Sequence, residues 1–254
     1  MNPSGGHLRE TRLDGTNPPK YVLDEWFDEF GVLAGITGAE SGYSLGLWSD
    51  EGAGTALERW RGFGTSFGPG IDQLVVGHQV HGTLVEPVGS FGSGILIREG
   101  VDGHATNNTG ILLTVLVADC VPVYLFHPPT KAMALLHAGW RGTAAGILGA
   151  GIEILATLGA RRPSDLVMHC GISVCGSCYQ VGPEVVKAVT GRVVSQPEYL
   201  DLRAVVRDQA RLLGIEKVST SPYCTVHDAD QFHSYRSSGA EAGRMAAYLG
   251  VPLS

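Results

Sequence analysis

The chain lacks the features of exported, membrane-spanning and nucleic-acid-binding proteins. It has no stretch of about 20 apolar residues, and residues 1–20 are polar, without the apolar core of a secretory signal. Its net charge of −7 is spread along the chain without a basic stripe, which disfavours a polyanion as the main partner. We therefore expect a cytoplasmic protein that acts on small molecules and binds neither nucleic acid nor membrane.

Charged residues and cysteines are also few. The five cysteines are an odd number in a chain of 254 residues, which indicates reduced thiols rather than a disulfide framework. Only 17% of residues are charged, whereas 44% are hydrophobic and 36 are glycine, so we expect a well-filled core joined by many tight turns. No Pro/Ser-rich linker divides the chain. We predict a flexible N-terminal tail over residues 1–24 and a single catalytic domain over residues 25–254, with the oligomeric state left open.

Apolar periodicity predicts both strands and helices. Short runs rich in Val, Ile and Leu indicate strands at 30–36, 73–80, 111–118, 121–126, 132–136, 166–170 and 217–221. Helical spacing of apolar residues indicates helices at 143–158, 183–190 and 202–213. The elements do not alternate as a strict strand–helix repeat. The predicted class is therefore α/β in the α+β sense, with mixed sheets flanked by helices rather than a doubly wound parallel sheet.

Three strong metal ligands stand beside apolar or glycine-rich sequence: His81, Cys120 and His137. Each follows or ends a predicted strand, and three such ligands are the number that a catalytic zinc uses when its fourth position stays open. Their separations of 39 and 17 residues form no local motif, so their convergence is a tertiary hypothesis. From the residues alone, Cys120 is more often a small core residue, and a histidine at a strand end is more often a structural hydrogen-bonding group.

Eight short strings carry a family resemblance. Gln-Val-His-Gly (79–82), Val-Asp-Gly-His-Ala-Thr (101–106), Ala-Asp-Cys-Val-Pro-Val (118–123) and His-Ala-Gly-Trp-Arg-Gly (137–142) are followed by Cys-Tyr-Gln-Val-Gly (178–182), Leu-Asp-Leu (200–202), Ser-Tyr-Arg (234–236) and Gly-Arg (243–244). In this order they resemble the family long called laccase-domain or multicopper polyphenol oxidase-like proteins. The resemblance covers the chain from about residue 30 to its end.

The resemblance implies a fold, a metal and an activity. The fold is a single laccase-like domain of mixed sheets flanked by helices, similar to the cysteine hydrolase fold of cytotoxic necrotising factor. The metal is zinc held by His81, Cys120 and His137, with copper as the alternative. Members are described as purine nucleoside phosphorylases that act on adenosine, inosine, guanosine and methylthioadenosine and that deaminate adenosine. Other descriptions are copper polyphenol oxidase (laccase) and, in a bacterial branch, editing of peptidoglycan precursors.

Ligand chemistry ranks these activities. A multicopper centre needs many histidines, and the chain has nine in mostly unrelated contexts. One cysteine and two histidines suit zinc, which supports deamination by activating water, and the same pocket could host phosphorolysis. A further alternative makes Cys120 a nucleophile and His137 its base, as in a cysteine amidase that edits peptidoglycan precursors. A binding protein that retains the site without activity is the non-enzymatic alternative.

Five more residues are candidates by position. Asp102 is assigned to catalysis, either to orient a histidine ligand or to transfer a proton, although it could instead cap a turn. The substrate-binding candidates are Asp119, Trp140, Arg141 and Arg236. Arg141 precedes the helix predicted from residue 143, where it could grip phosphate or form a surface ion pair. Trp140 could stack on a purine or anchor the core.

The remaining cysteines suggest a different class of protein. Cys170, Cys175 and Cys178 have the spacing C-x4-C-x2-C of plant-type iron–sulfur proteins, with Cys224 as the candidate fourth ligand. An electron-transfer or cluster-binding protein is therefore the rival hypothesis to a zinc enzyme.

Overall fold

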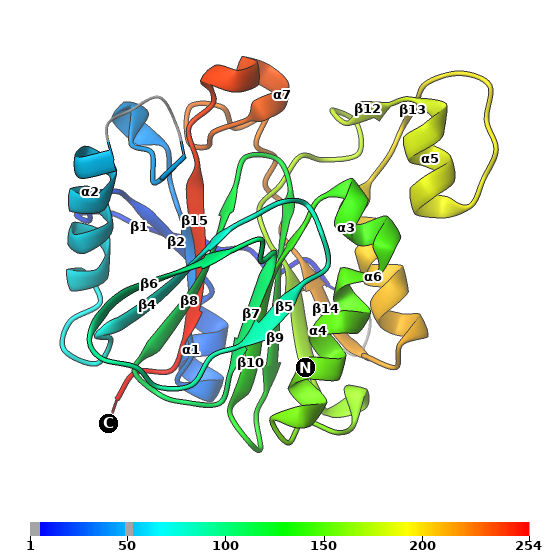
Figure 1. Cartoon of the computed structure of the whole chain (residues 1–254). Helices are drawn as coiled ribbons and strands as arrows, with labels where there is room; N and C mark the ends of the chain where they lie inside the picture. The colour runs from blue at the N-terminus through cyan, green and yellow to red at the C-terminus, as the bar shows by residue number, and fades with distance from the viewer. Residues whose placement is uncertain (1–5, 49–52, 254) are drawn as a thin grey trace.

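Two β-sheets packed face to face form the centre of the computed structural model, which describes residues 6–48 and 53–253 (Figure 1). One sheet has the order β1 (Thr11–Leu13), β2 (Lys20–Val22), β3 (Leu33–Thr37), β15 (Met245–Gly250), β8 (Ile111–Val117), β4 (Gln73–His78) and β6 (Gly94–Glu99). The other has the order β14 (Lys217–Thr220), β11 (Val167–Cys170), β9 (Val121–His127), β10 (Ala132–Ala138), β7 (Gly103–Thr106) and β5 (Val85–Pro87). A separate short pair joins β12 (Gln180–Val181) to β13 (Glu198–Tyr199).

The helices lie around these sheets. They are α1 (Asp24–Phe30), α2 (Ala53–Thr65), α3 (Trp140–Ala145), α4 (Ile147–Thr157), α5 (Pro183–Thr190), α6 (Leu202–Leu212) and α7 (Tyr235–Ser238). Short 3-10 turns occur at Glu40–Gly42, Pro163–Asp165 and Gly239–Glu241. Figure 1 shows α2 on the opposite side of the molecule from α3, α4 and α6. Among the described residues, no helix has the length and hydrophobicity needed to cross a membrane.

Both sheets are mixed, as the sequence predicts. In the larger sheet β4 pairs in parallel with β6 and β8, while β15 pairs antiparallel with β3 and β8. In the smaller sheet β11 and β14 are parallel, and β9 and β10 are antiparallel. All seven predicted strands and the helices predicted at 183–190 and 202–213 are present, with ends shifted by a few residues. The expected α+β class is confirmed.

Alternating side chains along the central strands fill three apolar layers. On β8, Ile111 and Leu113 point into the core between the sheets, whereas Leu112 and Leu116 pack on the other side. That outer layer includes Trp60 of α2. A third cluster joins the outer face of β10 to α4, α5 and α6. The strands β8, β9 and β10 thus bury both faces, which explains why they read as continuous apolar runs.

The helix predicted over residues 143–158 is two helices in the structure. α3 begins at Trp140 and ends at Ala145, and α4 begins at Ile147. Gly146 lies between them with φ of 90°, in the left-handed region that glycine adopts without steric cost. Apolar periodicity does not register such a break because both helices present apolar residues to the same core.

Part of the predicted N-terminal tail belongs to the larger sheet. Strands β1 and β2, within residues 1–24, pair with each other, and β2 pairs with β3. The Tyr21 side chain is fully buried in the core between the sheets, and Glu10 and Lys20 are also buried. The expected boundary at residue 24 therefore does not separate a tail from a domain here, because edge-strand pairing and aromatic burial hold this segment in place. Residues 1–5 of the predicted tail lie outside the described residues.

Candidate active site and metal centre

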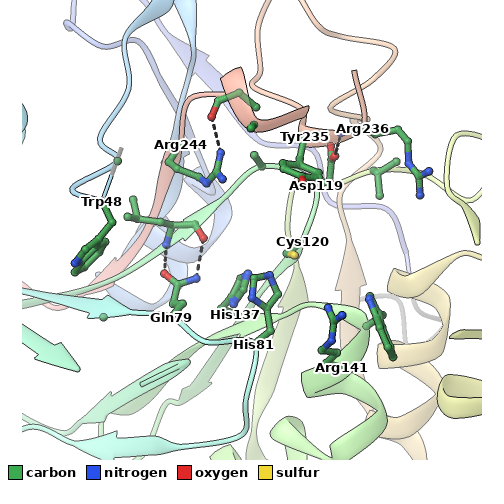
Figure 2. A pocket seen from close by; sticks show the side chains of 18 of the residues that line it. Trp48, Gln79, His81, Asp119, Cys120, His137, Arg141, Tyr235, Arg236 and Arg244 are labelled. Carbon is green, nitrogen blue, oxygen red and sulfur yellow. Dashed lines mark hydrogen bonds between the residues drawn. The ribbon is translucent and has the colours of Figure 1, made fainter. Parts of the chain in front are cut away.

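The two sheets bring His81, Cys120 and His137 together at one end of their central strands. His81 follows β4, Cys120 lies in the short connection between β8 and β9, and His137 is the penultimate residue of β10. One ligand atom of each lies within 4.8 Å of the others. The two imidazole rings approach edge to face, with centroids 4.9 Å apart (Figure 2). Three separate strand ends thus bring together the candidate ligands that the sequence listed without placing them.

The backbone around these ligands is unusual. His81 has φ of 61° and Asp119 has φ of 89°, both in the left-handed region that non-glycine residues rarely adopt. Gly139 packs against the group so closely that a Cβ atom there would lie 3.0 Å from His81 Cδ2 and 3.1 Å from Cys120 Sγ. The site therefore depends on a glycine at position 139. The surrounding contacts must also keep His81 and Asp119 in their strained backbone conformations.

The Asp102 side chain makes several of the contacts that keep this backbone in place. Its fully buried carboxylate accepts hydrogen bonds from the backbone N–H groups of Val80, His81 and Gly82 at 3.2, 2.9 and 2.7 Å. His137 Nδ1 donates a fourth bond to it at 2.9 Å. The bond fixes the orientation of the His137 ring and leaves Nε2 as the nitrogen available to a metal. Asp102 thus holds the loop of one ligand and the ring of another.

Charge within the group favours a thiolate beside an imidazolium. Burial raises the pKa of the Cys120 thiol, but the neighbouring His137 and His81 imidazoles outweigh it, so that pKa lies well below its ordinary value. Burial lowers the pKa of His137, whereas the Cys120 thiolate and the Asp102 carboxylate raise it above its ordinary value. For Asp102, burial raises the pKa, yet hydrogen bonds from His137 and Gly82 bring it below its usual value.

A pocket of about 830 Å³ opens directly over the three ligands. The labelled residues in Figure 2 that line it are Trp48, Gln79, His81, Asp119, Cys120, His137, Arg141, Tyr235, Arg236 and Arg244. Trp48 is 44% exposed and its ring stacks on His78 with centroids 4.4 Å apart. Tyr235, on α7, is 55% exposed. Two accessible aromatic rings therefore line a pocket whose floor carries the three candidate metal ligands.

Trp140 and Arg141 form a stacked pair in the first turn of α3. The Arg141 guanidinium carbon lies 4.3 Å from the centre of the Trp140 ring. Trp140 packs against the core cluster beneath α4, and Arg141 is exposed and lines the pocket. Among the residues that the structure describes, the guanidinium makes this ring contact and no hydrogen bond or ion pair. It is therefore held by its planar stacking while its N–H groups stay available.

Asp119 and Arg236 contact each other rather than standing independently. Asp119 Oδ1 accepts a 2.5 Å hydrogen bond from Thr225 Oγ1, and its Oδ2 accepts one of 2.5 Å from the Arg236 backbone N–H. The Arg236 guanidinium donates to the Gln180 carbonyl at 2.9 Å and lies 5.1 Å from the centre of the Tyr179 ring. Both Asp119 oxygens are thus engaged within the protein.

Gln79, Arg244 and Trp48, like Tyr235, line the pocket but were not candidates from the sequence. Gln79 clamps the end of β4 to β8, because its amide donates to the Leu116 carbonyl at 2.8 Å and accepts from the Leu116 N–H at 2.7 Å. Arg244 enters the pocket, held by a 2.5 Å bond to the Ala242 carbonyl. Both lie in strings that carry the family resemblance, which was the available signal. Trp48 had none, since it lies in no periodic segment.

The other cysteines do not form the group that their spacing suggested. Cys170 is fully buried on β11, and burial raises the pKa of its thiol to about 12. The ligand atoms of Cys175, Cys178, Cys224 and His227 lie within 4.8 Å of one another, and Cys170 is not among them. The C-x4-C-x2-C pattern that indicated an iron–sulfur protein is therefore not the grouping that the fold makes.

Comparison with known proteins places this architecture. Residues 37–252 match the family described as multi-copper polyphenol oxidoreductase laccase. The chain belongs to this family. It is 35% identical over 230 residues to a purine nucleoside phosphorylase of Streptomyces coelicolor, covering 87% of this chain and 92% of that protein. It is 30% identical over 225 residues to adenosine deaminase RL5 from an unknown prokaryotic organism, covering 81% and 86%.

A solved structure agrees with the fold. The crystal structure of YlmD from Geobacillus stearothermophilus superposes with a TM-score of 0.78 at 28% identity, covering 87% of this chain and 92% of that one. The family resemblance and the mixed-sheet fold expected from the sequence are thus both confirmed.

Proposed function

We propose that this chain is a zinc-dependent purine nucleoside phosphorylase that acts on adenosine, inosine, guanosine and methylthioadenosine and also deaminates adenosine. One observation carries the proposal: a His-Cys-His ligand group forms the floor of a pocket that three arginines line. The purine nucleoside phosphorylase and the adenosine deaminase among its relatives support the substrate class.

The ligand group fits zinc. It offers one thiolate and two imidazoles, and Asp102 orients one imidazole as the outer partners of zinc-binding histidines do. Bound there, zinc would supply a Lewis acid and lower the pKa of a water molecule. Within the part of the chain that the structure describes, the pocket carries this single three-ligand group. A multinuclear copper centre needs more histidines than that, so we assign the site to zinc rather than copper.

The arginines suit phosphate. In phosphorolysis a phosphate oxygen attacks the ribose carbon while the purine leaves, so the anion must be held beside the nucleoside. Arg141 presents a free planar fork, and Arg236 and Arg244 are both anchored to backbone carbonyls at the pocket wall. We assign Asp119 to positioning Arg236, because its Oδ2 accepts the Arg236 backbone N–H.

The aromatic residues divide into two roles. The Trp140 ring is covered by Arg141 and also packs against the core, so we assign it to holding that arginine rather than to stacking on a base. Trp48 and Tyr235 are exposed in the pocket and can stack on a purine ring. The volume of about 830 Å³ falls within the usual range for small-molecule sites and accommodates a nucleoside with phosphate.

One arrangement favours a second candidate function. Cys120, His137 and Asp102 stand in the order thiolate, imidazole and carboxylate, which is also the order of a cysteine hydrolase. An amidase acting on peptidoglycan precursors would use Cys120 as a metal-free nucleophile. One sulfur cannot serve both roles at once, so metal dependence separates the two functions.

The deciding experiment is a product assay by mass spectrometry. Zinc-loaded and chelated protein would each receive the four nucleosides, with and without phosphate, beside a set of muropeptide precursors. We expect zinc-loaded protein to release free purine and sugar phosphate only when phosphate is present. The same zinc-loaded protein should convert adenosine to inosine both with and without phosphate. Cys120→Ser should lose zinc and both activities. Precursor hydrolysis that survives chelation would instead establish the amidase.

Arg141→Lys tests the phosphate site separately. Lysine keeps the charge but loses the bidentate fork, so the KM for phosphate should rise about tenfold or more. Zinc content and adenosine deamination should stay near wild type, because neither involves that anion. Arg162→Lys, an exposed substitution far from the pocket, is the matched control. A parallel loss of both activities would show that Arg141 supports the fold or the shared purine site.

A further inference from the structure

A second set of metal-ligating side chains lies outside the pocket. Cys175, Cys178, Cys224 and His227 place one ligand atom each within 4.8 Å of all the others, and none of the four lines the described pocket. We propose that this Cys3His group is a structural zinc site, separate from the site of His81, Cys120 and His137.

The distances suit a tetrahedral ion. Zinc–sulfur bonds of about 2.3 Å put tetrahedral ligand atoms about 3.8 Å apart. Cys178 Sγ lies 3.1 Å from Nε2 of His227, and the one ligand atom that each of the four residues offers lies within 4.8 Å of the other three. Small side-chain adjustments around an ion would even out these separations. Three thiolates and one imidazole complete a closed four-ligand set, which is typical of structural zinc and leaves no position for substrate.

Each half of the group is a tight turn with two residues between its ligands. The Cys178 N–H donates to the Cys175 carbonyl at 3.1 Å, which closes the first turn. The second turn, from Cys224 to His227, is held by Asp228, whose N–H donates to the Cys224 carbonyl at 2.8 Å and whose carboxylate accepts from the Cys224 N–H at 2.9 Å. Paired turns of this spacing are the arrangement that small zinc sites use.

The surroundings of the sulfur atoms favour the binding of a cation. All five cysteines of the chain are free thiols, so no disulfide accounts for the meeting of three of them. The Cys175 N–H donates to Cys224 Sγ at 3.3 Å, a bond that stabilises a thiolate. Thiolates this close repel one another unless a cation lies between them. Thiolates are also soft ligands, which favour zinc over calcium or magnesium.

The position of the group between two loops suits a structural role. It joins the loop after β11 to the loop after β14, where Ser173 and Cys224 form an isolated parallel bridge. Both loops contact Asp119 at the pocket: the Val174 N–H donates to its carbonyl at 3.1 Å, and Thr225 Oγ1 donates to its carboxylate. The ion would therefore fasten the loop that carries Val174 of the pocket to the loop that leads to the pocket residues Tyr235 and Arg236.

Metal analysis of the whole protein tests the proposal. Protein purified under reducing conditions and loaded with Zn²⁺ should hold two zinc ions per chain by mass spectrometry of the metal. X-ray absorption should give an average of two sulfur ligands per zinc, against one if only the pocket site is filled. His227→Ala and Cys178→Ser should each bring the content to one zinc per chain. Cys170→Ala, which removes a buried cysteine outside the group, should keep two.

The outcomes separate this site from the proposed catalytic one. Cys120→Ser should retain one zinc with three sulfur ligands, even if the activity assignment fails. The proposal is overturned if wild-type protein holds one zinc with one sulfur ligand, if a disulfide forms within the group in reduced protein, or if the protein is brown with iron and sulfide. X-ray absorption on wild-type protein decides the matter even where a variant does not fold.

Discussion

Asp102 is a single residue on which two zinc-ligand candidates depend. Its carboxylate accepts three backbone N–H groups from the His81 loop and the Nδ1–H of His137 while fully buried. A carboxylate accepts at every lone pair, whereas an amide must donate at its nitrogen. An amide at position 102 would therefore set one donor against another.

We expect Asp102→Asn to weaken zinc binding by about 10- to 100-fold, the usual effect of losing the outer partner of a ligand histidine. Competition with a chromogenic chelator measures this affinity. Glu99→Gln is the control, because Glu99 pairs with His78 at 2.7 Å but orients no ligand. Unchanged zinc affinity in Asp102→Asn would mean that the backbone alone positions both histidines.

At the scale of elements, the seven apolar runs became strands, but some strands had no readable pattern. The sequence Met-Ala-Ala-Tyr-Leu-Gly of β15 forms a central strand between β3 and β8 and is buried throughout. Alanine and glycine have low β-propensity, and burial on both faces removes alternation. Strand identity there comes from its two neighbours rather than from its own residues.

The junction of α3 and α4 gives a matched pair of glycines. Gly146 has φ of 90°, so Gly146→Ala should lower the free energy of unfolding by about 1 kcal/mol. Gly149 lies within α4 with nothing within 4 Å of an added Cβ, so Gly149→Ala should raise that free energy by about 0.5–1 kcal/mol. Urea unfolding at fixed zinc content measures both. Changes of the same sign would contradict this account of the break.

For the whole molecule, the contact between the two sheets includes a buried histidine. His104 on β7 is fully buried, and its Nε2 would lie 3.1 Å from a Cβ at Gly77 of β4 in the facing sheet. Neither ring nitrogen has a hydrogen-bond partner in the described structure. Burial, with a smaller contribution from the Arg98 charge, lowers the pKa of His104 from 6.5 to about 4.

This depressed pKa makes stability fall in acid. Above pH 6.5 His104 is neutral in both states, but between pH 6.5 and 4 only the unfolded chain takes up the proton. The free energy of unfolding should lose up to about 3 kcal/mol from this residue over that range. Denaturant unfolding of wild type and His104→Leu at several pH values measures the difference. Parallel pH profiles would exclude the effect.

The sequence by itself determined the local features of this protein. Seven strands and the helices α4, α5 and α6 follow from the pattern of apolar residues. Strands buried on both faces read as apolar runs, and a helix buries one face at a spacing of nearly four residues. Ligand types and family strings are likewise local, so His81, Cys120 and His137 could be chosen as candidates. The meeting of these residues was decided by the pairing of β4 with β8 and of β9 with β10, and by the passage of the chain from one sheet to the other between β8 and β9.

Contacts between distant segments were decided only by the tertiary structure. The four hydrogen bonds of Asp102, the entry of Arg244 into the pocket and the choice of His227 over Cys170 each join such segments. The spacing of residues within one segment does not specify which residue of another segment they will contact. That contact depends on the register of the sheet and on how the loops close. The sequence therefore identifies candidate ligands, and the packing of the two sheets decides which of these residues meet.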